Sequence, residues 1–158
     1  MTPPELISLL QDFYRDTLDL FQRRQANAEL VSTYDGNNVY QQVISRQETH
    51  LRWVSDAIGD LGGELSGSEP DPKAVSGDVA AVVGSDARGQ QAFMNKWSAR
   101  VDSVTNARHQ KMLRLILGEM AEHGRGFEQL LEGRTDVLGR HADGKVLRGS
   151  VLPARPRN

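Results

Sequence analysis

Residues 43–63 read VISRQETHLRWVSDAIGDLGG and carry the first of two related motifs. Positions that recur at steps of three and four here are Val39, Val43, Gln47, His50, Val54, Ala57 and Leu61. That spacing is typical of one buried face of an α-helix. Gly62-Gly63 is a good C-terminal stop. The pattern therefore predicts a helix over residues 37–61, with Gln47 and His50 on its buried face.

Residues 113–133 read LRLILGEMAEHGRGFEQLLEG and repeat the arrangement. His123 lies on the apolar stripe of this stretch, and Met120 precedes it by three positions, as Gln47 precedes His50. Residues three apart on a helix point the same way. We therefore expect a helix over 107–132, ended by Gly133, whose motif faces the interior of a helical bundle together with that of 37–61.

Two further helices complete the expected fold. Thr2-Pro3-Pro4-Glu5 is a helix start, because a capping residue precedes two prolines and an acid, and it predicts a helix over 4–31. A fourth helix is predicted over 87–104. Residues 62–86, rich in Gly, Ser, Pro and Asp, are expected to be a long connection, in which the apolar patch 79–83 docks on the bundle or forms a short helical turn. A connection of this length suits a crossover along the whole bundle.

The chain divides into a bundle over residues 1–132 and an irregular tail over 133–158, which has six Lys and Arg against two Asp. With 158 residues and no cysteine, it can bury a core, and it has no disulfide, thiolate metal site or cysteine nucleophile. The net charge of −2 shows no bias toward nucleic acid or membranes. No signal peptide or membrane span is evident, so we expect a cytoplasmic protein without a nucleic-acid or membrane partner.

The two motifs and their order resemble the ferritin-like superfamily, and rubrerythrin-like members in particular. The resemblance covers about residues 5–132. It implies an all-α, antiparallel four-helix bundle with a long crossover between the second and third helices. It also implies a di-metal site, built from a Glu-x-x-His pair on each of two helices and one Glu on each of the other two.

The chain departs from that ligand set. The family's motif glutamates fall on Gln47 and Met120, which cannot bridge two metal ions. The other two helices are expected to offer no inward carboxylate at their centres, where the inward residues are Tyr14, Thr17, Met94, Trp97 and Val101. Of the six ligands that the resemblance implies, His50 and His123 survive.

Six residues on or beside the two motifs are the candidate metal ligands: His50, His123, Gln47, Glu48, Glu119 and Glu122. A two-histidine site could hold a transition metal, Fe or Zn, weakly. The alternative is that the imidazoles form hydrogen bonds inside a metal-free core. The three glutamates are most simply solvated surface charges, with Glu119 or Glu122 paired with Arg125.

The expected function is a non-catalytic binding or structural module with a degenerate di-metal site, which self-associates as a homodimer. The alternative is a metal-dependent oxidoreductase or iron-handling protein of rubrerythrin type, so whether the chain is an enzyme stays open. A DinB-like bundle with a three-histidine metal site is a rival family. His109 lies near the start of a helix and His141 lies in the tail, so neither supports such a site well.

The tail supports a minor alternative. Residues 147–152, LRGSVL, weakly resemble the C-terminal peptides by which ferritin-like cargo proteins attach to encapsulin shells. This resemblance implies a protein partner for the tail. A basic tail without such a partner is the simpler interpretation.

Overall fold

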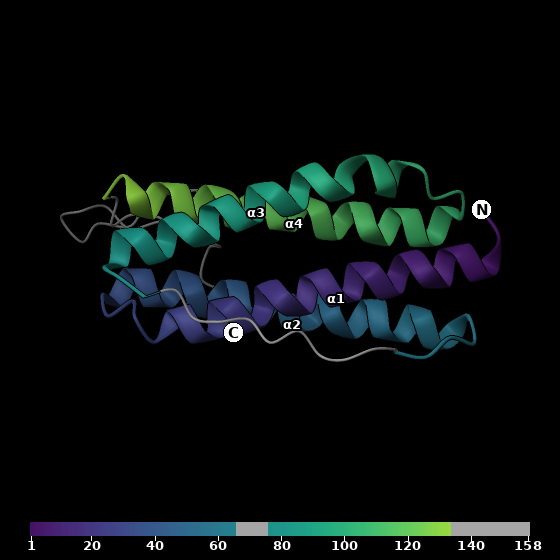
Figure 1. Ribbon diagram of the computed structural model, residues 1–158, viewed down its shortest axis with the longest axis horizontal. Coiled ribbons are helices and arrows are strands. Elements are labelled where there is room, and N and C mark those ends of the chain that lie inside the picture. The colour runs from purple at the N-terminus through teal and green to yellow at the C-terminus, as the bar shows by residue number, and fades with distance from the viewer. Residues whose placement is uncertain (66–75, 134–158) are drawn as a thin grey trace, which may run out of the picture.

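The computed structural model describes residues 1–65 and 76–133, and within them every regular element is a helix. Figure 1 shows the four helices, which are α1 (Pro3–Ala28), α2 (Tyr34–Asp60), α3 (Val79–Asp102) and α4 (Ala107–Leu131). The expected all-α fold with four long helices is confirmed. Three of the helices begin and end within three residues of the predicted positions.

The N-terminus of α3 corrects the sequence interpretation. Residues 79–83 form its first turn, and Val82 and Val83 are buried. The helix begins here because the Asp78 side chain caps it, accepting a 2.8 Å hydrogen bond from the backbone N–H of Ala81. The expected connector patch is therefore part of a core helix, which starts eight residues before the predicted position of 87.

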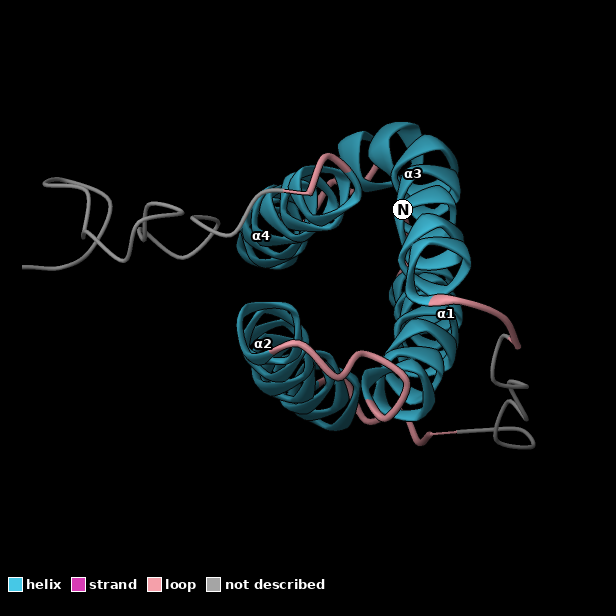
Figure 2. Cartoon of the chain, turned by 90° about the vertical axis from the view of Figure 1, so that its left-hand side faces the viewer, coloured by secondary structure: helices cyan, strands magenta, loops and turns pink. Residues whose placement is uncertain are grey.

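Each helix packs against two neighbours, so that α1 lies beside α2 and α3, and α4 lies beside α3 and α2 (Figure 2). Short turns make α1 antiparallel to α2 and α3 antiparallel to α4. The register between α1 and α3 is also antiparallel, because Asp12 bonds to Arg100 near one end while Asn27 bonds to Asp86 near the other. The molecule is thus an antiparallel four-helix bundle.

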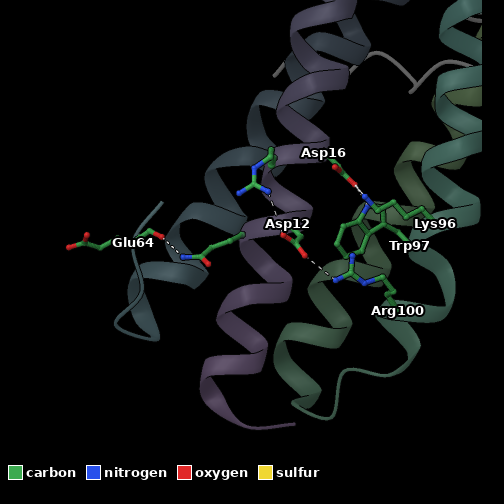
Figure 3. Close-up of polar contacts among 8 residues, drawn as sticks. Asp12, Asp16, Glu64, Lys96, Trp97 and Arg100 are labelled. Carbon is green, nitrogen blue, oxygen red and sulfur yellow. Dashed lines mark hydrogen bonds and ion pairs between the residues drawn. The ribbon is translucent and has the colours of Figure 1, made fainter. Parts of the chain in front are cut away.

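Polar contacts on the outer side of the α1–α3 interface fix this register (Figure 3). Arg100 donates a 3.2 Å hydrogen bond to Asp12. One turn further along α1, Asp16 accepts a 2.9 Å hydrogen bond from the indole N–H of Trp97 and forms a 2.6 Å ion pair with Lys96. The Trp97 ring is otherwise fully buried, so its one polar atom has a partner at the edge of the core.

The helix ends show how α2 and α3 are placed. Asp60 at the end of α2 lies near Arg108 at the start of α4, with 3.8 Å between the charged atoms. Val79 at the start of α3 lies beside Val31 and Leu130, at the opposite end of the bundle. The end of α2 and the start of α3 therefore lie at opposite ends of the bundle (Figure 1).

The apolar core has two parts. The larger, which we call the Phe13 cluster, fills the half of the bundle that holds the start of α1, and includes Leu10, Val54, Trp97 and Met120. The smaller, the Tyr40 cluster, fills the other half and includes Val31, Val83 and Phe127. In residues 1–65 and 76–133, none of the helices is both long and apolar enough to cross a membrane.

Candidate functional site

Seven of the nine buried polar side chains among the described residues separate the two apolar clusters, Thr17 and His109 being the other two. On every helix these seven fall between the stretch that enters the Phe13 cluster and the stretch that enters the Tyr40 cluster. Each is at most 8% exposed, and we call this set the polar layer: Arg24, Asn27, Gln47, His50, Asp86, Gln90 and His123. A layer to which all four helices contribute is where a helical bundle can build a binding site.

The two histidines meet in this layer. The centroids of the His50 and His123 rings are 6.2 Å apart, and the ring planes are inclined by 24°. The Nδ1 atoms of both rings are buried and have no hydrogen-bond partner among the described residues. The stripes thus correctly indicate that both imidazoles lie inside the bundle. The nitrogen lone pairs of an imidazole lie in the plane of its ring. Because these two rings are stacked and nearly parallel, their lone pairs do not point at one common metal position.

Glu119 joins His50 across the α2–α4 interface. Its carboxylate accepts hydrogen bonds of 2.6 Å and 3.2 Å from the guanidinium of Arg46, and its second oxygen contacts His50 Nε2. Burial raises the pKa of Glu119, but the hydrogen bonds from Arg46 and His50 outweigh it, so the net pKa is lowered. The Glu119 side chain is 29% exposed, and its partners are Arg46 and His50 and not Arg125; of the two expected pairs with Arg125, the one with Glu122 forms.

Arg24 is the centre of a buried network at the other side of the layer. Its Nη2 atom donates a 2.6 Å hydrogen bond to Gln90, and its Nε atom lies 4.0 Å from the Asp86 carboxylate. Asp86 also accepts hydrogen bonds from Asn27 at 3.0 Å and from the Tyr40 hydroxyl at 2.5 Å. Burial lowers the pKa of Arg24 to about 10, so the guanidinium is charged at neutral pH.

The histidines are neutral at pH 7. Burial and then the charge of Arg24 lower the pKa of His123 to about 3. Burial also lowers the pKa of His50, although the hydrogen bond to Glu119 opposes this change. A neutral imidazole can bind a metal, so protonation does not prevent binding here. What opposes metal binding is the positive charge of the arginine in the same layer.

Sequence reasoning missed Arg24, Asp86 and Gln90. Arg24 continues the spacing of Phe13, Thr17 and Leu20, so the helical stripe itself marks it as inward. Asp86 and Gln90 continue the stripe of α3 backward by the same steps, but Asp86 fell in the expected connection. Cationic side chains are rarely buried, and a stripe position was therefore not enough to suggest one.

The other three candidates, and Met120 at the second motif position, add no carboxylate or imidazole to the layer. Gln47 is fully buried, and neither its amide nitrogen nor its oxygen has a partner among the described residues. Met120 packs in the Phe13 cluster. Glu48 is exposed, and Glu122 is exposed and paired with Arg125. Of the six candidates, the structure therefore brings together only His50, His123 and Glu119, with His50 in contact with the other two.

These residues do not fit a pair of metal ions. Within residues 1–65 and 76–133, no group of three or more histidine, aspartate and glutamate side chains is arranged to hold a metal. Glu119 is engaged by Arg46 and His50, and Asp86 by Arg24, Asn27 and Tyr40. A di-metal centre needs several carboxylates to offset its charge in a low-dielectric core. Here the buried guanidinium of Arg24 lies in the same layer instead, and its charge disfavours further positive charge at His123.

Two of the clefts in the surface adjoin the polar layer or the end of the bundle. One, of about 310 Å³, lies between α2 and α4, and His123 is among its lining residues with Gln42, Glu122 and Arg125. The other, of about 400 Å³, lies at the end of the bundle where α1 meets α2 and where α3 begins. We call the second the end pocket, and its apolar lining comes from Val31, Val79, Val83, Leu130 and Leu131.

Fold and site together define an antiparallel, all-α four-helix bundle with a polar layer across its core. No protein-family model matches the chain, and no curated protein matches it.

Proposed function

We propose that the chain is a ferritin-like bundle of rubrerythrin type that has lost di-metal chemistry and acts as a non-catalytic binding or structural module. Three features support the family assignment. The helix order agrees with that architecture, and so do the opposite positions of the end of α2 and the start of α3. The third feature is the polar layer midway along the core.

The observation that carries the loss of chemistry is the burial of Arg24. The guanidinium is 0% exposed, lies within the layer that would hold metal ions, and lowers the pKa of His123. A positive charge at this depth opposes a second cation, because charge interactions are strong in a low dielectric. It also engages Asp86, a carboxylate that α3 contributes to the layer. The positive charge in the layer is thus that of Arg24, which pairs with Asp86.

Metal content tests this proposal. Protein produced in medium supplemented with iron and zinc, and purified without chelator, should contain less than about one Fe or Zn per chain and should not turn over oxygen or peroxide. Two Fe per chain with turnover would reject the proposal. The matched variant Arg23→Met removes an exposed neighbouring arginine, so a change in metal content seen with Arg24→Met but not with Arg23→Met would locate the effect in the core.

A metal-dependent oxidoreductase or iron-handling protein with an altered, single-metal site is the alternative. One observation favours it: the imidazoles of His50 and His123 are close, and their Nδ1 atoms have no partner among the described residues. Zinc titration of wild type and of His50→Gln separates the two proposals. Stoichiometric binding by wild type that His50→Gln abolishes would favour the alternative. The same weak binding in both would favour the non-catalytic module.

A further inference from the structure

The end pocket is an apolar hollow that the described part of the chain leaves open. Its volume is about 400 Å³, and Val31 and Val83 in its wall are almost fully buried. At its mouth the side chains of Val79 and Leu131 are 40% and 44% exposed. Exposed apolar side chains that surround a pocket mark a binding surface more often than scattered ones do. The question is which group covers them.

The chain itself leaves α4 at the wall of this pocket. Gly133 lines the end pocket, and its backbone N–H bonds to the carbonyl of Leu130 at 3.0 Å. Its φ of +77° lies in the left-handed region, which is typical of the glycine that ends a helix and turns the chain away from the helix axis. Any segment that follows Gly133 therefore starts beside the pocket.

The sequence that follows has side chains of suitable chemistry. Three Val-Leu pairs occur after Gly133, at 137–138, 146–147 and 151–152. The first pair is four and five residues from Gly133, which an extended chain spans in roughly 13–18 Å. That reach is sufficient for a pocket to which Gly133 itself belongs. The nearest pair also loses the least chain entropy on docking, because its loop is the shortest.

Charge complementarity points the same way. The pocket lining includes Asp35, and its end of the bundle also carries Asp78 and Glu132, each next to a lining residue. The first Val-Leu pair lies between Arg134 and Arg140, with Asp136 directly before it, so residues 134–140 carry a net charge of +1. A docked segment would thus bring a small net positive charge toward an acidic rim while its aliphatic side chains enter the apolar hollow.

We propose that the end pocket is the docking site for Val137-Leu138 of the same chain. The interaction covers the apolar mouth and holds the start of the tail against the bundle end. The end pocket shares no residue with the polar layer, so this proposal stands independently of the proposed function.

Engineered cysteines test the docking, because the chain has no cysteine of its own. In the full chain, Val79→Cys is combined with Gly139→Cys, beside the first Val-Leu pair, or with Arg148→Cys, beside the second. Docking predicts that the 79–139 disulfide forms within one chain roughly tenfold faster than the 79–148 disulfide, because docking raises the local concentration of the first thiol beyond the roughly fourfold advantage of its shorter tether. Non-reducing gels and mass spectrometry measure both rates.

A second pair of variants provides the control. Adding Val137→Asp and Leu138→Asp to the 79–139 protein should reduce its rate severalfold, to the smaller advantage over the 79–148 protein that its shorter tether alone gives. Adding Val146→Asp and Leu147→Asp should leave the rate unchanged. Equal rates for the two cysteine pairs, or covalent dimers as the main product, would overturn the proposal. So would a 79–139 rate that does not respond to the aspartates at 137 and 138.

Discussion

Arg24 on α1 donates a 2.6 Å hydrogen bond to the side-chain oxygen of Gln90 on α3, inside a core that excludes solvent from both residues. The guanidinium also lies over the ring of Phe127, 4.9 Å from its centroid. One cation therefore connects three helices at the level where the two apolar clusters meet. The nearest carboxylate, Asp86, is 4.0 Å from Arg24 Nε. The network holds the charge by hydrogen bonds and a cation–π contact as well as by its ion pair.

This arrangement predicts a large loss of stability in Arg24→Met. The substitution keeps an apolar stem but leaves the buried Asp86 carboxylate without its cation, which should lower the free energy of unfolding by about 3–5 kcal/mol. The double variant Arg24→Met with Asp86→Asn removes both charges and should recover part of that loss. Urea denaturation measures all three proteins.

The adjacent Arg23 is a matched control for this prediction. It pairs with Asp19 at 2.9 Å, but its side chain is 44% exposed. Arg23→Met should therefore change the free energy of unfolding by about 1 kcal/mol or less. Similar losses for Arg23→Met and Arg24→Met would contradict the structural role of the buried cation.

Glu119→Gln should lower the pKa of His50 further. The carboxylate contacts His50 Nε2 and raises the pKa of that ring against the effect of burial. A neutral amide in its place removes this stabilisation of the imidazolium, so the ring should titrate at lower pH. NMR chemical shifts of the His50 ring, followed during acid titration, measure the change.

Glu122→Gln is the control for that titration. Glu122 is on the same helix, but it is exposed and pairs with Arg125. Its substitution should leave the His50 titration unchanged. If both glutamine variants shift His50 equally, the effect arises from net charge and not from the Glu119 contact.

Much of the fold could be predicted from periodicity. The stripes that contain His50 and His123 correctly indicate two inward-facing helices, because the side-chain spacing of a helix is fixed by its geometry. The caps and glycines that end helices also lie where local chemistry requires them, as with Thr2, whose side chain and backbone form a capping box with Glu5. Such local rules need no tertiary structure.

The polar layer could be predicted only in part. Arg24 and Gln90 are 66 residues apart in the sequence, and their hydrogen bond depends on the antiparallel register of α1 and α3. The same is true of Glu119, whose partners Arg46 and His50 are on another helix. A stripe tells which residues face inward, but not which residue of another helix lies opposite. Polar pairing in the core is therefore a property of the assembled bundle.

His123 should make the bundle sensitive to acid. Its pKa is lowered to about 3 in the folded chain, against an ordinary value of 6.5 for histidine. The unfolded chain therefore binds more protons between these values, and stability is lost as the pH falls from 6.5 toward 3. In chelator-treated protein, His123→Leu should reduce the slope of unfolding free energy against pH by up to about 1.4 kcal/mol per pH unit in this window.

Urea denaturation at several pH values between 7 and 4 measures that slope. Glu122→Gln, an exposed substitution one residue away, should keep the wild-type slope above pH 5. A wild-type slope in His123→Leu would show that His123 takes up its proton in the folded state as readily as in the unfolded chain.

Met120→Glu restores one of the motif glutamates that the ferritin-like resemblance implies, and it separates the two functional proposals. Met120 is 0% exposed in the Phe13 cluster, so a carboxylate there should lower the free energy of unfolding by about 3 kcal/mol or more in metal-free protein. If the bundle has lost metal chemistry, added Fe²⁺ or Zn²⁺ should not reverse this loss. If His50 and His123 form a metal site, the new carboxylate should tighten binding, and metal should raise the melting temperature of Met120→Glu more than that of wild type.

Met94→Glu, at a half-buried position of α3, controls for non-specific metal effects, because its carboxylate can reach solvent. Thermal melts of the three proteins with and without metal therefore decide whether the polar layer retains any affinity for a second cation beside Arg24.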